Sequence, residues 1–209
     1  MHLDRFDILF FAALFPSVIL HEVSHGWVAL MFGDDTAKRA GRLTLNPIAH
    51  VDPFGTIILP ALLIATTHSA FGYAKPVPVN PRQLHNPREQ SMLVSLAGPA
   101  VNITLALAAA LAIHSVGVPR DVNKGPLLPS LIFAIGFANV ILAAFNLIPI
   151  PPLDGSAVIE RFLPRAWWPR YLHLRQYSMG LLLILVLLLP RVLLLPVFDF
   201  AFRQWFKLL

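Results

Sequence analysis

The sequence has no cysteine and few charged residues, and each of these facts excludes some classes of protein. Without cysteine there is neither a disulfide framework nor a zinc site built from thiolates. Charged residues make up 13% of the 209 residues, whereas a soluble domain carries roughly 25%. Hydrophobic residues make up 56%, and the mean hydropathy is +0.68. These values exclude an ordinary soluble enzyme and predict a polytopic α-helical membrane protein.

The net charge of +5 does not indicate a nucleic-acid partner. The lysines and arginines stand between apolar segments, as charges that flank membrane helices do. We therefore expect the lipid bilayer as the surroundings and no nucleic acid. The N-terminal apolar run is not expected to be a cleavable signal, because it contains His21, Glu22 and His25.

Apolar runs near the length that crosses a bilayer recur along the chain. Four of them predict transmembrane helices, at 8–32, 91–116, 127–148 and 177–196. A further run at 53–72 contains a proline and ends in polar residues. The tail, 197–209, mixes aromatic and charged residues and predicts an amphipathic helix at the membrane interface. We expect a single membrane-embedded domain over 1–209.

Two short stretches beside the run at 53–72 have the patterns of strands. Residues 41–46 alternate polar and apolar side chains, and the prolines of 73–80 favour an extended backbone. If both stretches lie on one membrane face, they can pair. The sequence therefore predicts a small β-sheet at the membrane edge.

The distribution of basic residues distinguishes two arrangements of 53–72 in the membrane, one that spans it and one that re-enters. If it spans the membrane, the basic residues of the loops divide eight to five between the two faces. If it enters and returns on the same face, they divide ten to three. The positive-inside rule favours the second division. We interpret 53–72 as re-entrant, which places the N-terminus outside and the basic loops in the cytoplasm.

The first apolar run contains the motif His-Glu-Val-Ser-His at 21–25. Helical spacing of four places His21 and His25 on one face, where both imidazoles can bind one zinc ion. Glu22 lies beside them and can take a proton from a metal-bound water. The alternative is a chance match with two histidines buried in a core. An ionisable cluster in a membrane helix rarely lacks a function, which favours the metal site.

A catalytic zinc needs a third protein ligand, and Asp154 is the best candidate. It lies in the proline-rich stretch 146–155, where the fourth apolar run ends. In the re-entrant arrangement the first and fourth runs are parallel, so Asp154 and His25 approach the same face. The alternative reading of Asp154 is a helix cap at the membrane interface.

Three motifs occur in order: His-Glu-Val-Ser-His-Gly at 21–26, Ala-Gly-Pro-Ala-Val-Asn at 97–102, and Asn-Leu-Ile-Pro-Ile-Pro-Pro-Leu-Asp-Gly at 146–155. With the Asn-Pro and Lys-Pro stretches at 45–55 and 74–81, they resemble the site-2 protease family. This is a family of intramembrane zinc metalloproteases, and the chain resembles its compact prokaryotic branch. Neither the PDZ module nor the nucleotide-sensing module of some relatives is recognisable.

The resemblance implies roles for individual residues. His21, His25 and Asp154 correspond to the ligands of one zinc ion per chain, and Glu22 corresponds to the general base. Asn146 matches an asparagine thought to steady the substrate backbone or the oxyanion; its alternative is a helix–helix hydrogen bond. For Asn102 we favour a structural role. The catalytic core is expected over about 8–156, with a C-terminal helix and tail over 177–209.

The function expected is hydrolysis of peptide bonds within or near transmembrane segments of other membrane proteins. The expected location is a prokaryotic cytoplasmic membrane. Two other classes compete with this reading. A catalytically inactive scaffold would keep zinc but would have no use for Glu22. A metal transporter would need ionisable residues toward both faces, and the outer halves of these helices have almost none. The substrate, the oligomeric state and any regulatory partner are not indicated by the sequence.

Overall fold

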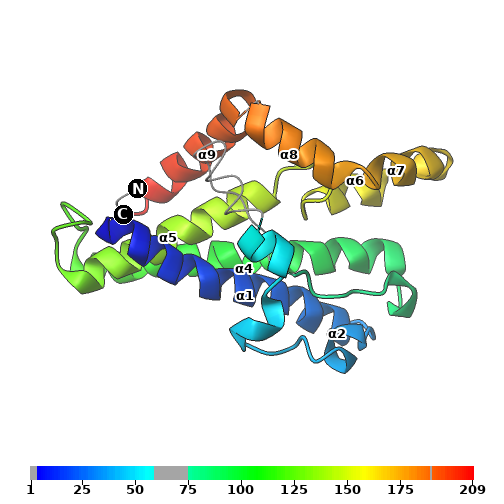
Figure 1. The fold of residues 1–209 in the computed structure, drawn as a ribbon, viewed down its shortest axis with the longest axis horizontal. Coiled ribbons are helices and arrows are strands. Elements are labelled where there is room, and N and C mark those ends of the chain that lie inside the picture. Colours follow the sequence, from blue (N-terminus) through cyan, green and yellow to red (C-terminus); the bar gives the residue numbers. More distant parts are fainter. Residues whose placement is uncertain (1–3, 59–74, 189) are drawn as a thin grey trace.

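Three long helices pack side by side and form the body of the protein (Figure 1). They are α1 (Arg5–Met31), α4 (Pro87–Val116) and α5 (Leu127–Asn146), and the computed structural model describes residues 4–58, 75–188 and 190–209. Shorter elements follow the chain between and after them: α2 (Thr36–Arg39), η1 (Pro47–His50), η2 (Pro53–Ile58), η3 (Pro81–Gln83), α6 (Ser156–Phe162), η4 (Arg165–Trp167), α7 (Trp168–Arg175), α8 (Ser178–Leu188) and α9 (Pro190–Phe206).

Hydrogen bonds at the helix ends give the directions of the three long helices. The start of α1 lies beside the start of α5, because the Arg5 guanidinium donates to the Gly125 carbonyl over 2.7 Å. The end of α1 lies beside the start of α4, because the His85 amide donates to the Phe32 carbonyl over 3.2 Å. Helices α1 and α5 are therefore parallel, and α4 runs antiparallel to both (Figure 1).

The stretch between α1 and α4 thus leaves and returns at one end of the bundle. This is the arrangement expected if 53–72 re-enters the membrane on the same face. Residues 53–58 of that segment form the short π-helix η2. The rest of it lies outside the described residues.

The prediction of four transmembrane helices was wrong. Over the described ranges, three helices are long and apolar enough to cross a membrane: α1, α4 and α5. The run at 177–196 is divided between α8, of 11 residues, and α9, which begins at Pro190. Proline lacks the amide hydrogen that continues a helix, and its ring clashes with the preceding turn. One apolar run therefore becomes two helices that meet at an angle (Figure 1).

The predicted membrane-edge β-sheet was also wrong, since residues 4–58, 75–188 and 190–209 contain no strand. The stretch 75–80 has an extended backbone, but its amides are used elsewhere. The amide of Lys75 donates to the His50 carbonyl, that of Val77 to Glu22 and that of Asn80 to Asp34. Pro76 and Pro78 have no amide hydrogen, so one side of the segment cannot form a ladder. On the other side, the amides of Lys75 and Val77 already have partners outside any strand. Side-chain and loop contacts hold this segment in place.

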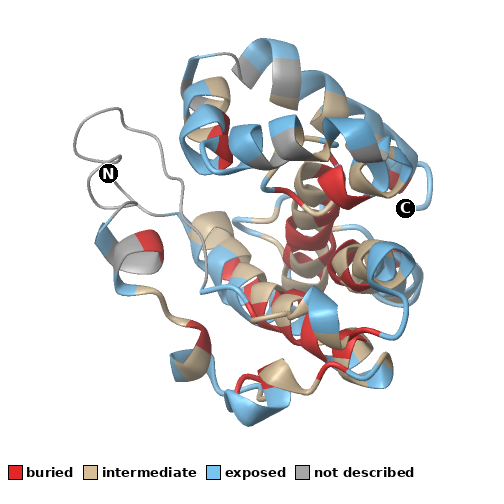
Figure 2. Cartoon of the chain, turned by 90° about the vertical axis from the view of Figure 1, so that its right-hand side faces the viewer, coloured by how far each residue is buried: buried red, intermediate tan, exposed pale blue. Residues whose placement is uncertain are grey.

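Buried residues concentrate where the three long helices face one another (Figure 2). Many are small: Ala134 and Ala138 of α5 are fully buried and pack against Leu9 and Ala13 of α1. Small side chains allow close approach of helix backbones, which is how membrane helices gain packing energy without a hydrophobic driving force. The outer surfaces of the same helices carry large apolar side chains, as expected for a bilayer-facing surface.

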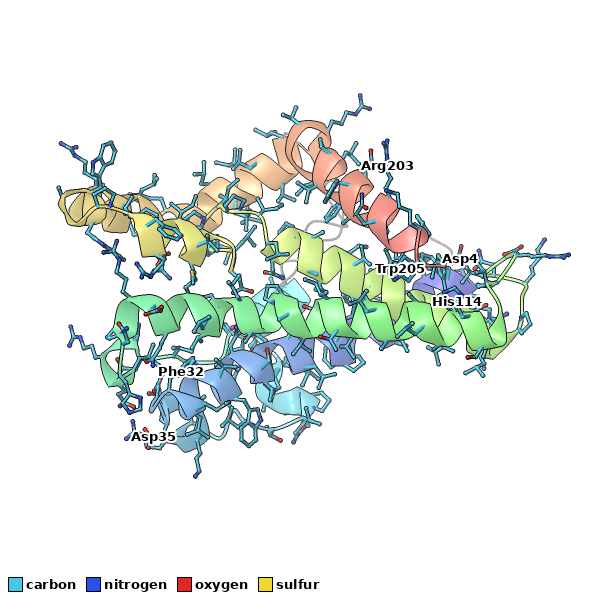
Figure 3. All side chains as sticks on the ribbon, turned by 180° about the vertical axis from the view of Figure 1, so that it is seen from behind. Asp4, Phe32, Asp35, His114, Arg203 and Trp205 are labelled. Atoms are coloured by element: carbon cyan, nitrogen blue, oxygen red, sulfur yellow. The ribbon has the colours of Figure 1, made fainter. Side chains whose placement is uncertain are left out.

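The C-terminal helix α9 folds back onto the bundle. Its Trp205 is 3% exposed and lies where α9 meets α5 (Figure 3). The Trp205 indole donates to the Ala106 carbonyl of α4 over 2.9 Å. The residues predicted as an amphipathic tail therefore include the end of a helix that packs on α4 and α5.

Candidate metal centre

His21 and His25 lie one turn apart on α1, and their Nε2 atoms face each other. The two Nε2 atoms are 3.1 Å apart, and the side chains belong to residues that are 5% and 8% exposed. The helical spacing of four brings them together, as the sequence predicts. The face that they share is directed toward α4 and the loop after α5.

Asp154 reaches the two histidines from the loop between α5 and α6. Its Oδ2 lies 3.1 Å from Nε2 of His21 and 3.5 Å from Nε2 of His25. The loop turns back tightly, because the Gly155 amide donates to the Asn146 carbonyl over 2.7 Å. A Cβ atom at Gly155 would collide with the Leu147 carbonyl, so the turn requires glycine there.

The Nδ1 atoms of both imidazoles lie within hydrogen-bond distance of oxygen atoms of α4. Nδ1 of His25 lies 2.7 Å from the Val94 carbonyl, and Nδ1 of His21 lies 2.6 Å from Oδ1 of Asn102. A carbonyl oxygen can only accept, so His25 carries its hydrogen on Nδ1. Its Nε2 lone pair is then directed at His21 and Asp154. Contacts of this kind orient histidines that bind metals.

Gly98 of α4 lies directly against the two imidazoles. A Cβ atom built on it would lie 2.5 Å from Cε1 of His21 and 2.6 Å from Nε2 of both His21 and His25. No real side chain fits at such distances. The Gly-Pro pair in the motif at 97–102 therefore lets α4 approach the cluster directly.

The arrangement fits a zinc ion by its donor chemistry. One atom from each of His21, His25 and Asp154 lies within 4.8 Å of the others, and Asp154 Oδ2 is a buried oxygen with no hydrogen-bond partner. Two imidazole nitrogens and a carboxylate are a donor set that zinc prefers.

A cavity of about 580 Å³ opens beside this cluster. Glu22 lines it, half-buried, and one of its carboxylate oxygens accepts the Val77 amide hydrogen over 2.9 Å. The extended segment 75–80 thus lies along one side of the cavity and holds Glu22 in position. The loop before α6 and the start of α8 contribute to the other sides through Leu153 and Leu182.

Asn146 stands at the end of α5 and lines the same cavity. Its side-chain amide donates to the Leu142 carbonyl of its own helix over 3.0 Å. It is not part of the cluster formed by His21, His25 and Asp154. The structure therefore brings all five predicted site residues to one cavity and brings three of them into mutual contact.

Comparison with known proteins agrees with this geometry. The profile of peptidase family M50, the site-2 protease family, matches residues 9–126 and 113–189. The chain belongs to peptidase family M50. The match includes the histidine motif on α1 and the Asp154 loop.

Several relatives of this M50 protein are named for the same chemistry. YwhC of Bacillus subtilis, a candidate zinc metalloprotease, is 40% identical over 82% of this chain and 77% of its own length. Rip2 of Mycolicibacterium smegmatis, also named a candidate zinc metalloprotease, is 32% identical over 95% of this chain and 70% of its own. The zinc metalloprotease MJ0392 of Methanocaldococcus jannaschii is 27% identical over 80% and 38%. No solved structure matches the chain.

The M50 membership and these relatives define the function in outline. The protein is an intramembrane zinc metalloprotease, zinc is its cofactor, and its three long apolar helices make it a multi-pass membrane protein. Its substrates are proteins in the membrane. The resemblance to the site-2 protease family is confirmed.

Several residues that shape the site were not predicted to contact its side chains. Asn102, for which a structural role was favoured, contacts His21 directly. The Val94 carbonyl contacts His25, and the Val77 amide contacts Glu22. Such backbone contacts cannot be inferred from the type of side chain at a position. Asn139 could have been noticed, because a buried amide within an apolar helix is costly unless it has a partner.

Proposed function

We propose that His21, His25 and Asp154 hold the catalytic zinc and that Glu22 is the general base. The position of Asp154 supports these assignments. Its Oδ2 is buried and has no hydrogen-bond partner, and it lies 3.1 Å from Nε2 of His21 and 3.5 Å from Nε2 of His25. Leaving those three groups together without a cation would cost free energy, because their lone pairs and charge face one another.

Each residue then has a defined task. A zinc ion held by these three residues would act as a Lewis acid toward a carbonyl and would make a water more acidic. Glu22 would accept a proton from the attacking water and donate it to the leaving amine. The Val77 amide donates to one Glu22 oxygen and so fixes the orientation of the carboxylate. Gly98 leaves the space that both imidazoles occupy.

We assign Asn146 to the substrate. It lines the cavity near Asp154, and its side-chain nitrogen has a second hydrogen besides the one given to Leu142. That hydrogen can be donated to the substrate backbone or to the oxyanion that forms during attack. Removing an oxyanion donor in other hydrolases costs about 100- to 1,000-fold in kcat.

The substrate is a transmembrane segment of another protein, cut within the membrane or at its edge. The cavity is lined by residues of α1, α4 and α5, the helices long enough to cross the membrane. A helical backbone uses its carbonyls in internal hydrogen bonds, so the segment must unwind locally before one of them can be attacked.

The test compares wild type with Glu22→Gln and Asp154→Asn in detergent. Zinc content is measured by elemental analysis, and cleavage is measured on a model transmembrane substrate. We expect wild type to hold one zinc and cleave, Glu22→Gln to hold zinc without cleaving, and Asp154→Asn to lose both. The matched controls Glu89→Gln and Asp199→Asn, both at exposed positions, should behave like wild type.

The same experiment separates the two competing functions. A zinc scaffold would hold zinc in wild type and in Glu22→Gln, and it would cleave in neither of them. A transporter would accumulate zinc across vesicle membranes, with no peptide product. Either result would overturn the proposed chemistry.

We further propose that the end of the bundle with the loops 33–52, 75–86 and 147–176 faces the cytoplasm of a prokaryotic cell. Most basic loop residues lie there, in agreement with the positive-inside rule. Since the chain has no cysteine, single-cysteine reporters need no background substitutions. A membrane-impermeant maleimide applied to intact cells should label Lys124→Cys and should label Arg39→Cys only after permeabilisation. The opposite pattern would reverse the orientation.

A further inference from the structure

A short chain of buried polar side chains connects the metal centre with the middle of the helix bundle. It consists of Asn102 on α4, Asn139 on α5 and Ser17 on α1, and each is buried with at most 4% of its surface exposed. None of the three carries a charge or touches the cavity. Polar groups at this depth are costly unless they are paired, so their hydrogen bonds define their orientation.

The orientation of Asn139 follows from a backbone carbonyl. Its side-chain nitrogen lies 2.8 Å from the Ile135 carbonyl, which can only accept, so the amide hydrogens must face that way. The second hydrogen goes to the Ser17 hydroxyl oxygen over 2.8 Å. Ser17 can accept it because its own hydrogen is donated to the Ala13 carbonyl. The Asn139 oxygen is therefore turned toward Asn102.

The orientation of Asn102 follows in turn. Its side-chain nitrogen donates to the Asn139 oxygen over 2.8 Å, which leaves its own oxygen facing Nδ1 of His21 at 2.6 Å. An amide oxygen only accepts, so neutral His21 carries its hydrogen on Nδ1. Its Nε2 is then free of hydrogen, and Nε2 is the atom that faces Asp154 and His25.

We infer that Asn139 and Ser17 are positioning residues that set the tautomer of His21 through Asn102. This inference rests on the proposed function, in which His21 is a zinc ligand. Without Asn139, Asn102 can rotate its amide and donate to Nδ1. The histidine hydrogen then moves to Nε2 and blocks the lone pair that binds zinc.

The two histidines differ in how their tautomers are set. The Val94 carbonyl sets that of His25, and no substitution removes a backbone carbonyl. Three side chains set that of His21, and each can be replaced. The zinc site is therefore sensitive to a residue, Asn139, that touches neither the metal nor its ligands.

The test measures zinc dissociation constants by chelator competition in detergent. We expect Asn102→Leu and Asn139→Leu each to weaken zinc binding by about 10- to 100-fold, as losses of outer-shell partners do. Ser17→Ala should weaken it only a few-fold, because the Ile135 carbonyl still orients Asn139. The control is Ser130→Ala on α5, which removes a buried hydroxyl that has no hydrogen-bond partner and should leave zinc binding unchanged.

A rescue separates the tautomer from simple packing. An aspartate at position 102 only accepts, so it holds the hydrogen on Nδ1 without help from Asn139. The double variant Asn102→Asp/Asn139→Leu should bind zinc within a few-fold of Asn102→Asp. If Asn139→Leu weakens binding equally in both backgrounds, Asn139 acts through packing and the inference is overturned.

A second measurement does not depend on the folding of any variant. In zinc-free wild type at alkaline pH, ring ¹⁵N shifts of labelled histidine, assigned with His21→Gln, report the tautomer of His21 directly. A hydrogen on Nδ1 supports the inference, and a hydrogen on Nε2 overturns it. Full zinc affinity in His21→Gln would instead contradict the proposed ligand set, which keeps the two failures distinct.

Discussion

Gly98 on α4 and Gly136 on α5 both stand where another part of the chain comes too close for a Cβ atom. At Gly98 the neighbours are the imidazoles of His21 and His25, and at Gly136 the neighbour is the indole of Trp205. The first contact positions the two imidazoles that we propose as zinc ligands. The second joins the C-terminal helix to the bundle through aromatic packing with Phe133 and Phe137.

A glycine that permits close approach thus serves two different purposes in this molecule. Around Gly98 the side chains are polar, and their hydrogen bonds define orientation. Around Gly136 they are apolar, and close packing supplies dispersion energy with little demand on direction. We therefore expect substitutions at the first contact to change zinc binding and substitutions at the second to change stability.

The largest effect is expected from Gly98→Ala. The added methyl group would lie 2.5–2.6 Å from atoms of both imidazoles, so both must move. Since the loss of one outer-shell partner already costs about 10- to 100-fold in metal affinity, displacing two ligands should cost roughly 1,000-fold. Chelator competition measures it, and wild-type zinc affinity in this variant would show that the contact at Gly98 is not close.

Trp205→Ala should produce the next largest effect, and it should be confined to stability. Removing a buried tryptophan costs about 3 kcal/mol or more, and the Ala106 carbonyl would lose its donor. We expect a lower melting temperature in detergent with an unchanged zinc dissociation constant. A comparable loss of zinc affinity would mean that the two regions are coupled.

Removal of zinc should lower the stability of wild type by an amount set by mass action. At free zinc 100 times above the dissociation constant, the stabilisation is about 2.7 kcal/mol. A melting curve recorded with and without chelator measures this difference. Trp205→Ala should show the same difference and Gly98→Ala almost none, which sharpens the division between the regions.

The smallest of these effects is expected at Asp34, which anchors the segment that positions Glu22. Burial raises the pKa of Asp34, but hydrogen bonds from Thr36 and from the Asn80 amide outweigh burial and hold that pKa below its ordinary value. The ionised carboxylate therefore stabilises the folded state. Its contribution is complete above the unfolded pKa of about 3.9 and is lost as pH falls through the lower folded value.

Asp34→Asn should therefore lower stability by about 1–2 kcal/mol at neutral pH, and less below about pH 4. Its neighbour Asp35 is the matched control. Asp35 pairs with Arg39 over 2.9 Å at an exposed position, where an ion pair contributes about 0–1 kcal/mol. Equal losses in Asp34→Asn and Asp35→Asn at neutral pH would show that burial of Asp34 does not matter.

The candidate site was predictable because its signals are local. The spacing of His21 and His25 places both on one helix face by geometry alone. Asp154 stood out because prolines end its helix next to an otherwise apolar run. The parallel course of α1 and α5 followed from the charges of the loops, and the hydrogen bonds at their ends agree with it.

The errors arose where local pattern and tertiary partners disagree. The stretch 75–80 is extended as its prolines require, yet its amides bind His50, Glu22 and Asp34 instead of a neighbouring strand. The run at 177–196 is apolar throughout much of its length, but Pro190 begins a new helix. Hydropathy measures burial in lipid and does not register a missing amide hydrogen.

Composition and helical spacing are properties of the chain, and they predict a membrane protein with residues that can bind and use a metal. How those residues are oriented depends on the packing of the helices. The tautomer of His21 depends on Asn102, Asn139 and Ser17, which lie on three different helices. A hydrogen bond between helices has a direction only after the helices have packed.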